Sequence, residues 1–181
     1  SPTLASVPTA QMLFRHGGTI NFRSIKNGTE TITSQGQRFY TNVINFIGGS
    51  ASTEFLLADD FYQNDAPAIT NEFLSGIASN MYLTSGKLNT NGKSLRLDYF
   101  QSSNSNLTRS LDIRNSRIDM WGRSESRTWN ADFVIANSSS STLTSNMTSF
   151  QASGSYIKFN VPNNGWGAGF CGGRGAGVQY A

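Results

Sequence analysis

Two tryptophans and an arginine form the best candidate for ligand recognition in this sequence. Trp121 and Trp129 flank the polar stretch GRSESR, which contains Arg123. An exposed indole ring can stack on a sugar ring, and an arginine presents several hydrogen-bond donors in a fixed fork. Tryptophan is more often largely buried, however. We therefore take Trp121, Arg123 and Trp129 as candidate glycan contacts, with interior packing as the alternative.

Carboxylates are the other group whose chemistry could matter. Glu54, Asp59, Asp60 and Asp65 lie near one another in the chain, and glycoside hydrolases work through a pair of carboxylates. Asp59 and Asp60 are adjacent, however, and neighbouring residues of an extended chain point to opposite faces. With a single histidine and a single cysteine, the chain lacks a zinc pair, a cysteine cluster and an internal disulfide. We expect no catalytic residues, no metal and no cofactor.

The glycine-rich end of the sequence imitates a nucleotide-binding motif. Residues 167–172 spell G-x-G-x-x-G, but only nine residues follow and they do not start a helix. A dinucleotide fingerprint requires that helix and a later acidic residue. The single GGRG at 172–175 and a net charge of +3 also give no basic stripe for nucleic acid. The glycines therefore indicate a turn.

Arginines are densest between residues 109 and 127. We interpret them as the solvated side of strands whose apolar residues face a core. These arginines are Arg109, Arg114, Arg117, Arg123 and Arg127.

The composition favours an all-β protein with many turns. Charged residues make up only 14%, well below the usual quarter, and serine, asparagine and threonine supply the polarity. A hydrophobic content of 37%, with 12% aromatic residues, argues against disorder. No apolar run approaches the length of a membrane helix, so we expect a chain that does not span a membrane.

Short alternating segments predict strands. They are Thr31–Thr33, Leu95–Leu97, Leu111–Ile113, Phe133–Ile135 and Tyr156–Phe159, and turn signals such as NGT at 27 and NTNG at 89 separate them. Only Asn71–Leu83 has helical spacing, and a strand fits that segment equally well.

One phrase occurs twice, and it suggests how the strands are arranged. Leu111, Ile113 and Asn115 recur 22 residues later as Phe133, Ile135 and Asn137. A solenoid requires such a repeat because each coil lies on the one before. The interval predicts a parallel β-helix with rungs of about 22 residues, in which Leu111 stacks on Phe133 and the asparagines occupy left-handed corners. An antiparallel β-sandwich is the alternative.

Three longer phrases add a resemblance. They are FYTNVINFIGGSASTEFLLADDF at 39–61, LTSGKLNTNGKSLRLDYFQSSNSNLTRSLDIRNSRI at 83–118 and FCGGRGAGVQY at 170–180. Together they resemble a repeat of very large Bacteroidota cell-surface proteins, although Arg174 interrupts the glycine run. The resemblance implies a parallel β-helix repeat region over 35–181, as a fragment of a longer chain, with 1–34 as an N-terminal cap or first rungs. It also implies type IX secretion and a role in adhesion or gliding.

These inferences lead to a structural and adhesive function. We expect an extracellular, cell-surface segment that acts as a rigid rod or as a surface for adhesion, and that is not an enzyme. The expected partners are further repeats of the same chain, other cell-surface proteins or surface polysaccharide, and not nucleic acid. A glycan-binding module is the first alternative function, and a polysaccharide-active β-helix enzyme is the second.

Overall fold

The computed structural model describes residues 13–63, 80–102, 107–120, 132–134, 147–159 and 169–171. These residues form fourteen strands and contain no helix, and therefore none that could cross a membrane. The strands are β1 (Leu13–Ser24), β2 (Gly28–Ile32), β3 (Arg38–Gly48), β4 (Thr53–Leu57), β5 (Phe61–Gln63), β6 (Asn80–Asn89), β7 (Leu95–Leu97), β8 (Tyr99–Gln101), β9 (Arg109–Asp112), β10 (Arg117–Met120), β11 (Asp132–Val134), β12 (Met147–Gln151), β13 (Tyr156–Phe159) and β14 (Gly169–Cys171).

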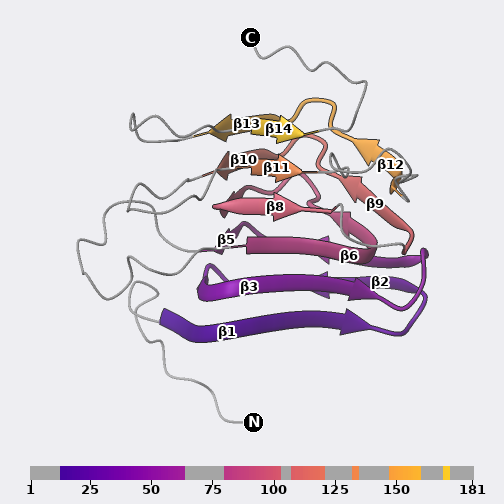
Figure 1. The fold of residues 1–181 in the computed structure, drawn as a ribbon, viewed down its shortest axis with the longest axis horizontal. Coiled ribbons are helices and arrows are strands. Elements are labelled where there is room, and N and C mark those ends of the chain that lie inside the picture. The colour runs from indigo at the N-terminus through magenta and orange to yellow at the C-terminus, as the bar shows by residue number, and fades with distance from the viewer. Residues whose placement is uncertain are drawn as a thin grey trace.

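Every strand pair among the described residues is parallel. The strands form three runs of neighbours: β1-β3-β6-β8-β11-β14, β2-β4-β6-β9-β12 and β3-β5-β7-β10-β13. The long strand β3 belongs to the first and third runs, and the long strand β6 belongs to the first and second. Figure 1 shows them as layers, with β1 at one end and β13 and β14 at the other. An antiparallel sandwich would contain antiparallel strand pairs, which hairpins can join. Since the strand pairs among the described residues are all parallel, this alternative is wrong.

The alternation of apolar and polar residues located the strands well. Leu95–Leu97 is β7 and Tyr156–Phe159 is β13, and the Leu111 and Phe133 segments lie in β9 and β11. In the segment where helix and strand fitted equally well, residues 80–83 belong to β6, whose side chains alternate between buried and half-buried. The alternation of buried and half-buried side chains is that of a strand and not of a helix.

The predicted stacking of Leu111 on Phe133 is wrong. Leu111 pairs with Leu88 on one side and Phe150 on the other, whereas Phe133 pairs with Phe100 and Phe170. The two copies of the repeated phrase thus lie in different runs of strands.

A single 22-residue interval does not describe the layers either. Side-chain hydrogen bonds between neighbouring layers join residues 19 apart at Leu83 and Ser102, 22 apart at Thr90 and Asp112, and 39 apart at Arg109 and Thr148. Parallel pairing fixes the length and register of the strands, while the connections between them can vary in length.

Left-handed residues mark the turns, as the sequence predicted. Asn91 and Gly92 of NTNG have φ values of 54° and 70°, and Asn115 has a φ of 57°. Asparagine and glycine tolerate this conformation best. The main-chain N–H of Asn115 donates to the carbonyl of Ser153, so that Asn115 stacks on the next turn. Asn137 and Ile135 lie outside the described residues.

The core consists of columns of apolar side chains that run through the layers. One column contains Ile44, Met81, Phe100 and Phe133, each 1% exposed or less. The rings of Phe100 and Phe133 stack with their centroids 4.6 Å apart. Residues of all three runs meet in one buried cluster, so the runs of strands share a common core.

Candidate functional site

The residues predicted to contact glycan are Trp121, Arg123 and Trp129. All three lie outside the described residues, so this site stays a prediction.

The adjacent carboxylates Asp59 and Asp60 accept hydrogen bonds from two different layers of the stack. Asp59 accepts hydrogen bonds from the main-chain N–H groups of Ser34 at 2.8 Å and Gln35 at 2.6 Å, in the preceding layer. Asp60 accepts one from the N–H of Ser94 at 2.8 Å, in the following layer. Both residues lie between β4 and β5 and not in a strand, so the alternation expected for an extended segment does not apply to them. The two carboxylates therefore join different layers of the stack.

An open surface hollow of about 430 Å³ lies beside these carboxylates. Asp60 accepts a hydrogen bond from the Tyr62 hydroxyl at 2.9 Å, and the Arg96 guanidinium lies 5.2 Å from the centre of the Tyr62 ring. These contacts engage the carboxylate oxygens of Asp60 and one face of the ring. Among the described residues, no three histidine, cysteine or acidic side chains group as metal ligands. The hollow is lined by Gly36, Ala58, Asp59, Asp60, Tyr62 and Lys93.

Asp59 should make the folding stability of the protein depend on pH. Burial raises the pKa of its carboxyl, but hydrogen bonds from Ser34, Gln35 and Gly36 outweigh that effect and hold the pKa below its ordinary value. A carboxyl with a depressed folded-state pKa stabilises the fold at pH values above its unfolded-state pKa of about 3.9. That contribution is lost as pH falls through the folded-state pKa.

We expect Asp59→Asn to lower the melting temperature at pH 7 and to weaken its fall below about pH 4. The amide places an N–H₂ donor opposite a main-chain donor, so that one bond is lost. Thermal melts of the wild type and the variant from neutral to acid pH measure both effects. Glu30→Gln also removes one carboxylate charge, but its amide oxygen can still accept the hydrogen bond from the Ser24 hydroxyl, and it serves as the control. An Asp59→Asn melting curve that keeps the full pH dependence of the wild type would contradict this role.

Three of the five arginines predicted to be solvated lie among the described residues, and they divide into two groups. Arg114 and Arg117 are exposed and form ion pairs with Asp112 at 2.6 Å and Asp119 at 3.0 Å. For Arg109 the prediction is wrong, because it is only 1% exposed. Residues 109 and 111 point to the same side of a strand, so Arg109 shares the inner side with Leu111. Desolvation lowers the pKa of its guanidinium.

A different part of the surface combines aromatic and amide side chains. It lies on the outer side of β1, β3, β6 and β8, where two columns of paired residues run through the layers: Asn21, Asn45, Tyr82 and Gln101 in one, and Thr19, Val43, Asn80 and Tyr99 in the other. We call these eight residues the amide–tyrosine face. The sequence does not reveal this face, because its residues come together only through the register of the strands.

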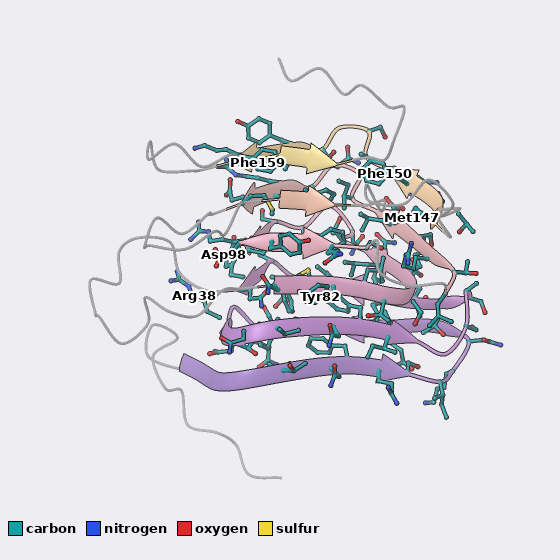
Figure 2. All side chains as sticks on the ribbon, in the orientation of Figure 1. Arg38, Tyr82, Asp98, Met147, Phe150 and Phe159 are labelled. Carbon is teal, nitrogen blue, oxygen red and sulfur yellow. The ribbon has the colours of Figure 1, made fainter. Side chains whose placement is uncertain are left out.

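Contacts within the amide–tyrosine face hold its side chains in place. The Asn45 amide donates to the Asn21 side-chain oxygen at 2.8 Å, and the Tyr99 hydroxyl donates to that of Gln101 at 3.1 Å. The rings of Tyr82 and Tyr99 meet edge to face with centroids 6.3 Å apart. Figure 2 shows Tyr82 on β6, in the middle strands of the stack.

Comparisons with known proteins add no relative: no protein-family model, curated protein or solved structure gives a significant match to this chain.

Proposed function

We propose that the chain is a parallel β-helix that serves as a rigid structural and adhesive segment of a bacterial cell-surface protein. The observation that carries the proposal is the exclusively parallel pairing of strands around one core among the described residues. Parallel strands whose side chains line up in columns are the defining pattern of a solenoid. The sequence resemblance to Bacteroidota surface repeats is the reason for proposing a cell-surface location, with type IX secretion and a role in adhesion or gliding.

Rigidity follows from the way in which the layers are joined. Main-chain hydrogen bonds between parallel strands run along the stack, and each layer adds about 4.8 Å. Polar side chains add further links: Glu54 accepts hydrogen bonds from Thr29 in one layer at 2.8 Å and from Asn89 in another at 3.0 Å, and pairs with Lys87 at 2.7 Å. A stack joined in this way suits a spacer under load. Further repeats or other surface proteins are the proposed partners.

Labelling of intact cells tests the surface location. Antibodies against the purified chain are applied to intact and to permeabilised cells that make the native protein. We expect equal labelling of both, and weaker attachment under flow when the gene is deleted. Labelling that appears only after permeabilisation, or attachment that is unchanged by the deletion, would overturn the proposal.

A glycan-binding module is the second candidate function, because the amide–tyrosine face offers aromatic and amide groups without a network of charges. We do not propose a polysaccharide-active enzyme, since Asp59 and Asp60 direct their oxygens to main-chain donors in different layers.

A further inference from the structure

Charge is distributed unevenly over the outer surfaces of the stack. The outward side chains described on the paired segments of β1, β3, β6 and β8 include two arginines near strand ends, Arg23 on β1 and Arg38 on β3, whereas the eight residues of the amide–tyrosine face carry no charge. By contrast, the β4-β6-β9 side carries the Glu54–Lys87 ion pair, and the β5-β7-β10-β13 side carries Arg96 and the Arg117–Asp119 ion pair. Such a contrast indicates that the amide–tyrosine face suits an uncharged ligand.

The groups on this face are those that recognise sugars. A tyrosine ring offers an apolar surface for the C–H side of a pyranose, and its hydroxyl and the neighbouring carboxamides can both donate and accept hydrogen bonds. Tyr82 is half-buried, and within the described part of the chain its hydroxyl has no hydrogen-bond partner. The side-chain amide of Asn80 likewise has none among those residues. Both groups can therefore bond a ligand without breaking a hydrogen bond among the described residues.

The face is also ordered before any ligand arrives. Tyr82 packs against the ring of Tyr99, and Asn45 is held by Asn21. Side chains that are already fixed lose little rotamer freedom on binding, which favours affinity. Because the strands repeat about every 4.8 Å along the stack, the two columns offer regularly spaced contacts to an extended chain polymer.

We propose that the amide–tyrosine face binds a neutral, extended glycan, with the Tyr82 ring as the main contact. This inference is independent of the proposed cell-surface location, because binding is measured on the purified chain whereas location is measured on cells. It also differs from the tryptophan site predicted from the sequence, since it uses neither Trp121 nor Trp129.

Biolayer interferometry on the immobilised chain tests the proposal. The probes are soluble neutral polysaccharides, namely a mixed-linkage β-glucan, a xyloglucan and a galactomannan, together with the anionic polymer alginate. We expect at least one neutral polymer to bind and alginate not to bind. Binding should be unchanged from about 0.1 M to about 1 M salt, over which the Debye length falls from about 10 Å to about 3 Å. Failure of all three neutral polymers to bind, or binding that salt abolishes, would overturn the proposal.

Variants then assign the surface. Tyr82→Ala is expected to weaken the affinity at least tenfold, which corresponds to about 1.4 kcal/mol, while Tyr82→Phe keeps the ring and most of the affinity. Tyr156→Ala is the matched control, since Tyr156 is 57% exposed and lies on β13 over Arg117, on the charged side. Circular dichroism melts verify that each variant is folded. An equal loss for Tyr82→Ala and Tyr156→Ala, or no loss for either, would overturn the assignment to this face.

Discussion

Phe46→Ala is expected to lower the free energy of unfolding by about 3–5 kcal/mol, the usual range for removing a buried phenylalanine ring. Phe46 is fully buried, and its ring centroid lies 5.4 Å from that of Phe22 and 5.5 Å from that of Phe55. These rings belong to β1, β3 and β4, so the cavity would open where two runs of strands meet. Domains have only about 5–15 kcal/mol of stability in total, so this one substitution should remove a large part of it.

Chemical denaturation followed by tryptophan fluorescence and circular dichroism measures the loss. Val43→Ala is a suitable control, because Val43 lies on the same strand but points outward and is half-buried. Its loss should stay below about 1 kcal/mol, as for most surface substitutions. If Phe46→Ala proved no more destabilising than Val43→Ala, the common core would not be the main source of stability.

Gly86→Ala should be nearly as damaging, for a different reason. Gly86 has a φ of +82°, and a Cβ there would lie 2.7 Å from the Thr53 carbonyl oxygen and 3.3 Å from the Gly48 Cα. The backbone conformation is strained for alanine, and main-chain atoms cannot move aside as a flexible side chain can. We expect a loss of about 3–5 kcal/mol from strain and overpacking together.

Gly36→Ala separates these two effects. Gly36 has a similar φ of +72°, but a Cβ added there would meet no described atom within 4 Å. Only the conformational strain remains at this position, and the loss should be about 1–2 kcal/mol. Denaturation midpoints of both variants give the comparison. Equal losses would show that the close approach of Gly86 to Thr53 has no energetic consequence.

The sequence predicted strands better than it predicted their neighbours. Period-two burial depends on adjacent residues only, so Leu95–Leu97 and Tyr156–Phe159 could be located without knowledge of the fold. The partner of Leu111 depends on how much chain separates one layer from the next. That length varies, and the partner is Leu88 rather than Phe133.

The same distinction explains what was found and missed in the candidate sites. The alternation expected for Asp59 and Asp60 assumed an extended segment, whereas they lie between two strands and bond to different layers. The inward position of Arg109 follows from strand parity, but its charge suggested solvent instead. Tyr82 and Tyr99 are 17 residues apart and meet only through the register of β6 and β8, which no local pattern reveals.

The unequal spacing of bonded residues, from 19 between Leu83 and Ser102 to 39 between Arg109 and Thr148, has an evolutionary consequence. Doubling the length of a flexible loop costs only about 0.6 kcal/mol, much less than disturbing one buried side chain. Insertions and deletions between strands can therefore accumulate while the core stays the same. The connections between strands can therefore change in length and sequence far faster than the arrangement of the strands. This makes the scaffold easy to diversify by selection or by grafting.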